Sequence, residues 1–398
     1  MLRLSVVLAC IPLAFLLYSY LIYPLALWLL IRLRDQPHRG AVAEQWPRIT
    51  ITVPCYNEEG SIAATIESLL ALDYPENRRH LLIISDASTD RTDDIVRSYA
   101  GRGVELLRLP RRGGKTAAEN AAIARLQGDI VVNADATVRI VPGSLKPLIA
   151  AFQDATVGVA SGRDISAGDS RSTGNEGESG YVGYEMWIRA LETGLGGIIG
   201  ASGCFFATRR ALYDGAFPES LSRDFASCLI AREHGYRAVS IDAATAIVPR
   251  TASLRVEYRR KVRTMARGLA TLQFKRHLLN PFRYGAFSLM LASHKLGRWL
   301  FQLTMPLLLV AAPLFAAAVP WTAYWIAVGV IACTTAAMVS WWWPEERPMP
   351  RLVAAPGYFI WSNVAGLMAW VKFFRGETNA IWEPTRRPDA QVEVTPNS

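Results

Sequence analysis

Acidic and amide side chains follow two apolar, strand-like segments of this 398-residue chain. The segment Leu81–Ser85 runs into Asp86, and the segment Asp129–Val132 runs into Asn133 and Asp135. An open α/β sheet binds its ligands at the carboxyl ends of its strands. Carboxylates at that edge typically hold the base and ribose of a nucleotide, and a divalent cation that in turn holds the phosphates. The pattern therefore predicts a nucleotide site with a metal ion.

Either acidic motif alone is also compatible with an ordinary capping role. Ser88 and Asp90 precede the helix expected over Thr92–Ala100, and Ser and Asp side chains accept hydrogen bonds from the first amides of a helix. The long apolar segments elsewhere in the chain favour ligand binding over capping.

A lysine follows two glycines where the third expected helix begins. Gly113 and Gly114 precede Lys115, and the helix is expected over Thr116–Leu126. The amides at a helix N-terminus attract anions, and an ammonium group at the same place adds positive charge. We therefore expect the phosphates of the nucleotide to lie there.

Strand and helix patterns alternate through this part of the chain, which predicts an α/β domain with a mostly parallel sheet. The expected strands are Ile49–Val53, Leu81–Ser85, Val104–Leu109 and Asp129–Val132, with helices over Ser61–Leu72, Thr92–Ala100 and Thr116–Leu126. The part after them is less regular. It predicts a long mobile loop over Ser161–Gly183, followed by a helical stretch from Tyr184 to Leu191, a strand over Gly203–Thr208 and a helix over Phe225–Glu233.

Three long segments carry no charged residue: Ser5–Ile31, Trp299–Pro344 and Leu352–Val371. A helix that spans a membrane needs roughly 20 such residues. The second segment has room for two spans, and Val319-Pro320-Trp321 is the natural break between them. The third segment contains Pro356 and Gly357, so it could also be re-entrant or interfacial. The sequence therefore predicts an integral membrane protein.

Basic residues indicate the orientation. Arg3 precedes the first apolar segment, whereas Arg32, Arg34 and Arg39 follow it, so the positive-inside rule places the following domain in the cytoplasm. We expect an inner (plasma) membrane protein with a cytoplasmic catalytic domain. The expected parts are an anchor over 1–34, a catalytic domain over 48–250, amphipathic interfacial helices over 251–297, membrane helices over 298–374 and a tail over 375–398.

The formal net charge of +9 suits anionic lipid and phosphate groups better than nucleic acid, for which no motif is visible. Val256–Leu272 has an apolar stripe on one side and basic residues on the other sides, which is typical of an interfacial helix. A helix packed on the catalytic domain is the alternative.

The five cysteines are scattered, so we expect neither a disulfide nor a metal site from them. His294 is interpreted as a contact to a headgroup or a backbone carbonyl.

Four motifs together resemble the cytosolic domain of the family 2 glycosyltransferases, which have the GT-A fold. They are V-P-C-Y-N-E-E at 53–59, D-A-S-T-D at 86–90, G-K-T-A-A-E-N at 114–120 and N-A-D at 133–135. The resemblance covers about Arg48 to Arg267. The flanking apolar segments resemble the membrane-embedded polysaccharide-synthase branch, the relatives of cellulose, chitin and poly-N-acetylglucosamine synthases.

The resemblance implies a role for each matching residue. On the donor side, Asp86 would bind the base and ribose, and Tyr56 and Glu58 would line the base pocket. Lys115 would approach the phosphates, and Asp135, with Asn133 beside it, would hold Mg²⁺ or Mn²⁺ on the diphosphate. Arg263 is also assigned to the donor site. On the acceptor side, Asp224 would act as general base, with Ala201, Ser202, Gly203 and Arg223 around the acceptor.

Three departures from the family pattern concern the site. Asn133 replaces the first carboxylate of a D-x-D motif, which keeps an oxygen ligand but removes a charge. Arg223 replaces the first member of an acidic pair, where it could depress the pKa of Asp224 or bind acceptor charge. The Q-x-x-R-W motif of processive enzymes is not kept around Arg263, which either contacts the diphosphate or meets lipid headgroups.

The resemblance implies an inverting, metal-dependent membrane glycosyltransferase. It would move a sugar from a nucleotide donor, a UDP-sugar by expectation, to a lipid-linked or polysaccharide acceptor at the cytosolic membrane face. An inactive regulatory subunit that binds nucleotide sugar is the alternative that Asn133 and Arg223 motivate. A lipid flippase is disfavoured, because transport pathways usually place ionisable residues within the spans.

Overall fold

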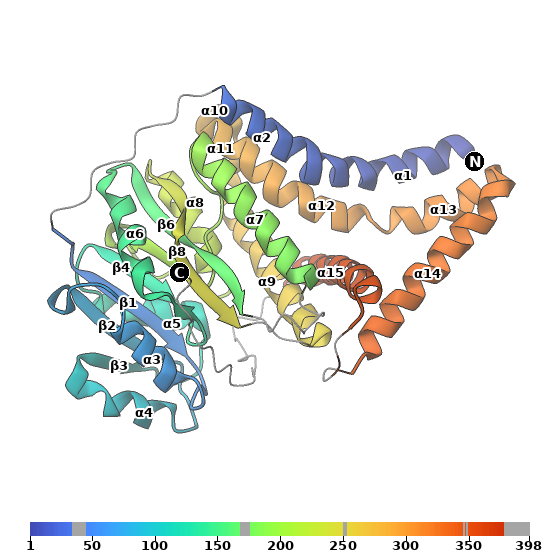
Figure 1. Cartoon of the computed structure of the whole chain (residues 1–398). Helices are drawn as coiled ribbons and strands as arrows, with labels where there is room; N and C mark the ends of the chain where they lie inside the picture. Colours follow the sequence, from blue (N-terminus) through green and yellow to red (C-terminus); the bar gives the residue numbers. More distant parts are fainter. Residues whose placement is uncertain (34–44, 168–175, 250–252, 345–346, 348, 378–398) are drawn as a thin grey trace, which may run out of the picture. The chain divides into compact units, whose positions relative to one another are not determined.

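The core of one part of the molecule is an eight-stranded mixed sheet (Figure 1). The computed structural model describes residues 1–33, 45–167, 176–249, 253–344, 347 and 349–377. These residues divide into two compact units. The sheet unit contains the described residues within 45–167 and 197–249, and the helical unit those within 1–33, 176–196 and 253–377.

The sheet combines a parallel half with a mixed half. The strands are β1 (Ile49–Cys55), β2 (Arg79–Ser85), β3 (Val104–Arg108), β4 (Ile130–Ala134), β5 (Arg139–Ile140), β6 (Val157–Ala167), β7 (Phe205–Arg209) and β8 (Arg237–Pro249). Their order is β3-β2-β1-β4-β7-β6-β8-β5. Strands β1 to β4 pair in parallel, β7 runs antiparallel to β4 and β6, and β8 is parallel to β6. The carboxyl ends of β1, β2 and β4 therefore meet at one edge.

Helices cover the sheet because each presents small or apolar side chains to it. The helices of this unit are α3 (Ile62–Leu70), α4 (Thr92–Ser98), α5 (Lys115–Ala122), α6 (Leu145–Ala150) and α8 (Arg223–Glu233). Three alanines of α5, residues 117, 118 and 122, pack on Leu82 and Ile84 of β2. Side chains this small let the helix backbone lie close to the sheet, and this fixes the position of the α5 N-terminus.

The structure confirms the four predicted parallel strands and the helices between them. It corrects the loop predicted over Ser161–Gly183. Strand β6 continues to Ala167, and α7 (Glu176–Leu195) begins before the predicted loop ends. Residues 161–167 are polar, yet they pair along their length with β8, and this non-local pairing outweighs their weak strand propensity. Strand β8 itself was not predicted.

Gly128, just before β4, is required by two features of its backbone. Its φ of +78° lies in the left-handed region, and an added Cβ would lie 2.2 Å from the carbonyl oxygen of Arg48. We expect Gly128→Ala to destabilise the protein by about 2–4 kcal/mol, from steric overlap and backbone strain. Thermal unfolding in detergent, followed by circular dichroism, measures the effect. The control is Gly101→Ala, whose Cβ would meet no atom within 4 Å; equal melting temperatures for the two variants would contradict the expectation.

The helical unit contains long apolar helices. They are α1 (Leu2–Leu17) and α2 (Tyr23–Arg32), joined by a π-helical segment (Tyr18–Ile22), then α7, α9 (Leu254–Phe274), α10 (Pro281–Tyr284), α11 (Ala286–Leu291), a second π-helical segment (Ala292–Leu296), α12 (Gly297–Thr304), α13 (Leu307–Ala318), α14 (Ala323–Trp342) and α15 (Arg351–Phe374). Among the described residues, three helices are long and apolar enough to cross a membrane, or up to four if the bent pair Ala286–Thr304 and Leu307–Ala318 is one span.

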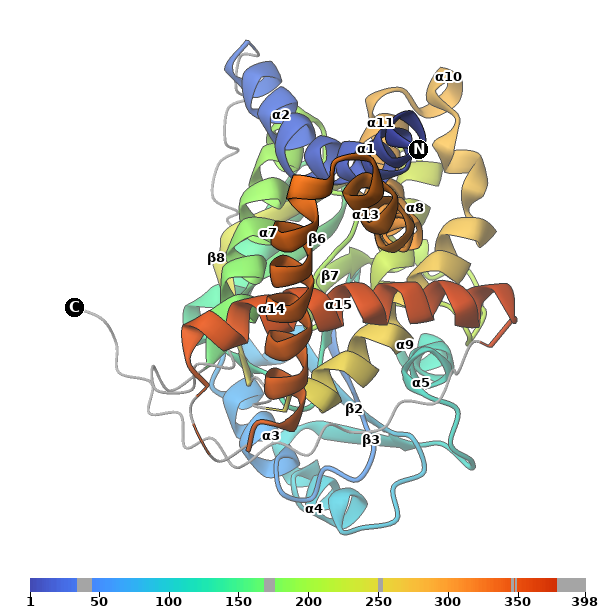
Figure 2. The ribbon, with the colours of Figure 1, turned by 90° about the vertical axis from the view of Figure 1, so that its right-hand side faces the viewer.

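A short 3₁₀ turn (Pro320–Thr322) separates α13 from α14 where the sequence predicted a break. The segment Leu352–Val371 lies within the single helix α15, which continues through Pro356. Figures 1 and 2 together show the axis of α15 crossing that of α14.

The predicted amphipathic helix over Val256–Leu272 is α9. It packs on α15, and the Lys261 ammonium donates to the Tyr358 hydroxyl (2.9 Å) and to the Ser362 hydroxyl (2.8 Å).

A buried polar cluster joins α2, α7 and the region of α12. His294 Nδ1 lies 2.6 Å from Glu192 Oε1, and His294 Nε2 lies 3.1 Å from Glu185 Oε2. The Tyr23 hydroxyl donates to the same oxygen of Glu192 at 2.6 Å, and Arg298 pairs with Glu185. Burial alone would raise the pKa of Glu185, but Arg298 and His294 hold it well below its usual range. The interpretation of His294 as a headgroup or carbonyl contact is therefore wrong.

Candidate active site

Asp86, at the end of β2, fixes the glycine pair that leads into α5. Its Oδ1 accepts a hydrogen bond from the Gly113 amide (2.7 Å), and its Oδ2 accepts one from the Gly114 amide (2.8 Å). Gly114 has a φ of +88°, which favours glycine at this position. The Asp86 side chain is buried. It therefore sets where the backbone turns into the N-terminus of α5.

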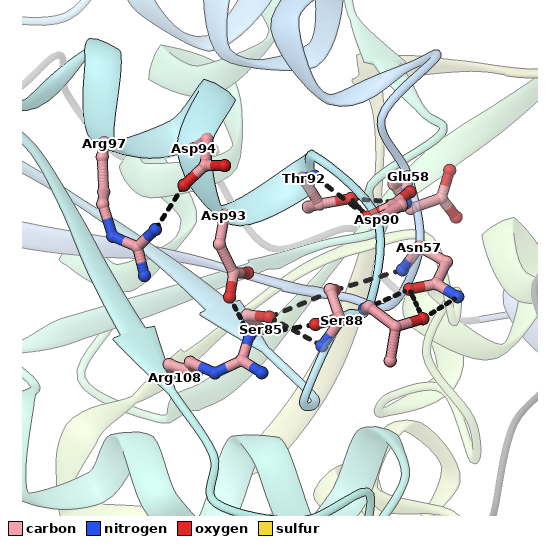
Figure 3. Close-up of polar contacts among 11 residues, drawn as sticks. Asn57, Glu58, Ser85, Ser88, Asp90, Thr92, Asp93, Asp94, Arg97 and Arg108 are labelled. Atoms are coloured by element: carbon pink, nitrogen blue, oxygen red, sulfur yellow. Dashed lines mark hydrogen bonds and ion pairs between the residues drawn. The ribbon is translucent and has the colours of Figure 1, made fainter.

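The loops after β1 and β2 are joined by side-chain hydrogen bonds (Figure 3). Asn57 Oδ1 accepts from the Thr89 amide at 2.8 Å, and the Glu58 amide donates to Thr92 Oγ1 at 2.8 Å. Asp90 Oδ1 accepts from the Thr92 amide at 2.9 Å. Asp90 thus bonds the first amide of α4, although the N-cap residue of that helix is Arg91 and has no side-chain cap. This contact coexists with the nucleotide-site pattern instead of replacing it.

Two non-glycine residues in these loops have left-handed backbones, Asn57 with φ 51° and Ala87 with φ 59°. Asparagine adopts this conformation readily, whereas for alanine it costs about 1–2 kcal/mol. Residues held in such conformations cluster at functional sites, because the surrounding structure must over-determine them. Ala87 directly follows Asp86, so the strain coincides with the first predicted donor-site carboxylate.

Tyr56 and Glu58, predicted for the base pocket, lie at the end of β1. The Arg112 guanidinium stacks on the Tyr56 ring, 3.8 Å from its centroid, which is a favourable cation–π geometry. The Ser61 hydroxyl donates to Glu58 Oε2 at 2.6 Å, and Glu58 is largely buried. Arg112 was not among the predicted site residues.

Lys115, the first residue of α5, reaches the end of β4. Its ammonium donates to Asp135 Oδ1 at 2.6 Å and to the Gly203 carbonyl at 2.8 Å. Burial alone would lower the pKa of Lys115, but the carboxylates of Asp135, Glu119 and Asp224 outweigh it and raise the pKa. The lysine is therefore a permanent cation at the strand edge.

Asp224 lies in the first turn of α8 and faces the same place. The Ser222 hydroxyl donates to Asp224 Oδ1 at 2.5 Å, and a Cβ built on Gly203 would lie 2.8 Å from Asp224 Oδ2. The Asp224 carboxylate also raises the pKa of Lys115. The structure thus brings together Lys115, Asp135, Gly203 and Asp224, all predicted from sequence.

Gly203→Ala tests how closely the Asp224 carboxylate must approach the backbone. The new methyl group would overlap Asp224 Oδ2, so the carboxylate must move. If Asp224 is the base that the resemblance implies, we expect turnover to fall at least tenfold, because misplacing a reacting group by about 1 Å can cost two orders of magnitude. Steady-state turnover of nucleotide sugar measures this. Gly143→Ala is the control, since its Cβ would meet nothing within 4 Å; unchanged turnover in Gly203→Ala would refute the requirement.

Ser202, predicted on the acceptor side together with Ala201, is buried. Its hydroxyl donates to Asp164 Oδ1 at 2.6 Å, and its amide donates to Ser161 Oγ at 2.8 Å. Both partners lie on β6, in the stretch that was predicted to be a loop. Asp164 was therefore missed, because its position depends on a strand that the sequence does not indicate.

Asn133 and Arg223, two departures from the family pattern, point into the interior. Asn133 Oδ1 accepts from Thr52 Oγ1 and from the Tyr213 hydroxyl, both at 3.1 Å. Burial, followed by the Glu119 carboxylate, raises the pKa of Tyr213 to about 12, so the phenol keeps the proton that it donates. Arg223 is buried against other side chains. Arg263 lies on α9 in the helical unit, and its role stays a prediction.

Glu119 is a buried carboxylate that was not predicted. It lies one turn after Lys115 on α5, and its Oε2 is 3.5 Å from Arg223 Nε. Burial raises the pKa of Glu119, while Lys115 and Arg223 oppose the shift. The signal in the sequence was a glutamate surrounded by alanines on a short helix, at a spacing of four from the lysine.

A divalent cation would fit at Asp135 but not at Asn133. Asp135 keeps about a third of its side chain exposed, whereas Asn133 is buried and its Oδ1 already accepts two hydrogen bonds. Among the described residues, no three His, Cys, Asp or Glu side chains group as metal ligands. Mg²⁺ and similar ions are commonly held by one or two carboxylates together with substrate phosphates and water. The residues present suit that mode of binding.

Comparison with known proteins agrees with this geometry. The model of the glycosyl transferase family 2 matches residues 50–217. A beta-monoglucosyldiacylglycerol synthase of Nostoc sp. is 29% identical over 170 residues, which are 42% of this chain and 36% of the relative. An N-acetylglucosaminyltransferase of Bradyrhizobium diazoefficiens is 25% identical over 311 residues, 73% of this chain and 62% of the relative. The chain thus matches less than two thirds of the length of each of these relatives.

A solved structure shows the same fold. The mannosyltransferase PcManGT from Pyrobaculum calidifontis, in complex with GDP-Man and Mn²⁺, superposes with a TM-score of 0.67 at 21% identity, over 94% of this chain and 99% of that one. The GT-A fold is therefore established for this chain. With the matched family model and the carboxylates gathered at its strand edge, the chain contains a family 2 glycosyltransferase domain.

Proposed function

We propose that the protein is an inverting, metal-dependent glycosyltransferase of the membrane. It transfers a sugar from a nucleotide donor, a UDP-sugar, to a lipid-linked or polysaccharide acceptor at the cytosolic membrane face. The observation that carries the proposal is the cluster of Lys115, Asp135 and Asp224 around Gly203, at the N-terminus of α5.

The donor is held at the edge of the parallel half of the sheet. Tyr56 and Glu58 line the base pocket, and Asp86 binds the base and ribose while it positions Gly113 and Gly114. Lys115 neutralises phosphate charge beside the amides at the α5 N-terminus. Asp135 holds Mg²⁺ or Mn²⁺, which when bound supplies positive charge for the leaving diphosphate.

Asp224 is proposed as the general base. It removes the proton of the acceptor hydroxyl, whose oxygen attacks the anomeric carbon as the bond to the diphosphate breaks. Because no protein nucleophile intervenes, the anomeric configuration inverts. Ala201, Ser202 and Gly203 form part of the acceptor-side wall, and Asn133 and Arg223 support the site from the interior. Neither of these two residues blocks the cluster, which weakens the argument for an inactive regulatory subunit.

The apolar helices support a membrane acceptor. Three candidate spans would keep the protein in the inner membrane, where lipid-linked substrates are concentrated in two dimensions. One curated relative is named for a glucosyldiacylglycerol product and another for N-acetylglucosamine transfer. A lipid or lipid-linked saccharide acceptor is consistent with both.

Nucleoside diphosphate release by the detergent-purified chain tests the proposal. UDP-glucose, UDP-N-acetylglucosamine and GDP-mannose are supplied in turn, with a lipid extract as acceptor, with and without Mn²⁺ or Mg²⁺. Metal-dependent release from one donor, with radiolabelled sugar appearing in the lipid or polymer fraction, is the expected result. Tight UDP binding with no release from any donor would favour the regulatory subunit.

A further inference from the structure

Glu119 and Arg223 form an almost fully buried charged contact near the candidate active site. The side chains are 2% and 4% exposed, and Glu119 Oε2 lies 3.5 Å from Arg223 Nε. In the part of the chain that the structure describes, neither carboxylate oxygen of Glu119 accepts a hydrogen bond. A buried ion pair without hydrogen bonds on its carboxylate stabilises a fold poorly. Arg223, one member of this pair, directly precedes Asp224. The pair therefore calls for a reason other than stability.

Arg223 is held on several sides. Its guanidinium carbon lies 5.0 Å from the centroid of the Tyr213 ring and 5.5 Å from that of the Phe217 ring. Its Nη2 donates to Asn120 Oδ1. These contacts leave the guanidinium little freedom, and since Arg223 precedes Asp224 in the same helical turn, they restrict the backbone that carries the carboxylate.

One face of α5 holds the segment that leads to Asp224. Thr116 Oγ1 donates to the Leu221 carbonyl at 3.0 Å. Asn120 Nδ2 donates to the Phe217 carbonyl at 2.7 Å, and the Phe217 amide donates to Asn120 Oδ1 at 2.9 Å. Thr116, Glu119 and Asn120 are spaced by three and four residues and share this face.

The same helix also begins with the phosphate-site cation. Lys115 contacts Asp135 and the Gly203 carbonyl, and Gly203 lies against the Asp224 carboxylate. A single rigid helix thus fixes Lys115 at its start and the segment before Asp224 along its side. Any movement of α5 relative to α8 would change the distance between the donor phosphates and the base.

We propose that Glu119 and Arg223 are positioning residues for Asp224: their buried ion pair joins α5 to the first turn of α8 and sets the base at its working distance from the donor site. The inference rests on the proposed function, because it assigns a role at that reaction. It also explains the arginine that replaces an acidic residue before Asp224. A basic residue stands at position 223 because its partner, the Glu119 carboxylate, lies on α5 in the interior.

Glu119→Gln, Arg223→Gln and the double variant test the proposal, with Arg97→Gln, from an exposed pair with Asp94, as the matched control. For each we would measure turnover of the donor that the wild type uses, the melting temperature, and the dissociation constant of UDP or GDP, whichever the wild type releases. We expect each single variant to lose roughly tenfold to a hundredfold in kcat, with the dissociation constant within about threefold, because a misplaced group affects the reaction far more than binding. The double variant should lose no more than the worse single variant, because the two residues act as one unit.

Wild-type turnover in single variants that fold would overturn the positioning role, and so would a proportional loss of turnover and nucleotide affinity, which indicates general disruption. If a single variant fails to fold because one buried charge is left alone, the neutral double variant decides. Normal kcat in the folded double variant refutes the role, and reduced kcat with intact nucleotide binding supports it. A wild type that releases no nucleotide from any donor would instead contradict the proposed function.

Discussion

Replacing Asp224 by asparagine is expected to reduce sugar transfer by about 10²–10⁴-fold, the usual contribution of a positioned general base. The amide keeps the size of the side chain and can still accept from the Ser222 hydroxyl, but it cannot take a proton from the acceptor. Nucleotide affinity should change little, because the predicted donor contacts lie on β1, β2 and α5.

For Asp224→Asn, steady-state turnover measures the expected loss of sugar transfer, and calorimetry measures whether nucleotide affinity is unchanged. Asp94→Asn is a matched control, since Asp94 is also an acidic residue in the first turn of a helix, and removing it changes the helix-terminal charge in the same way. Full activity in Asp224→Asn would remove Asp224 from the mechanism. Loss of activity together with loss of nucleotide binding would indicate that the residue supports the donor site instead.

The second large effect is expected in the helical unit, from Arg298→Ala. This change leaves Glu185 buried without the arginine that pairs with it, and breaking a buried pair from one side costs about 3–5 kcal/mol. Thermal unfolding in detergent, followed by tryptophan fluorescence, should show a melting temperature lower by many degrees.

Two controls accompany Arg298→Ala. Arg97→Ala breaks an exposed pair and should change the melting temperature little. The double variant Glu185→Gln/Arg298→Gln removes both charges and should recover part of the loss, because a neutral pair leaves no uncompensated charge. A melting temperature for Arg298→Ala equal to that of wild type would show that the cluster contributes no stability to the helices that it joins.

The parallel half of the sheet could be predicted because its information is local. Each of the strands β1, β2 and β4 is a short apolar run that ends in polar residues, and Gly114-Lys115 marks the start of α5 in the sequence itself. The same local signals predicted Asp86, Lys115 and Asp135, whereas Asp224 was implied by the family resemblance. The structure places Lys115, Asp135 and Asp224 around Gly203. Their proposed chemical roles remain to be measured.

What could not be predicted depends on partners far away in the chain. The polar residues 161–167 form a strand only because β8 pairs with them. The sequence therefore could not predict the position of Asp164 or its hydrogen bond to Ser202. Glu119 looks like an ordinary helix surface residue until Arg223, about a hundred positions later, covers it. His294 was interpreted without its two carboxylates for the same reason, since Glu185 and Glu192 lie on a helix more than 100 residues earlier.

The place of α7 in the chain limits how the protein can be dissected. This helix groups with the helical unit, yet its sequence lies between β6 and β7 of the sheet unit. A single proteolytic cut or a shortened gene therefore cannot separate the two units. A fragment spanning residues 45–249 would carry Glu185 and Glu192 without Tyr23, His294 and Arg298, and would expose carboxylates and apolar surface that the whole chain buries. Expression trials of the sheet unit alone should therefore remove α7 as well as the terminal helices.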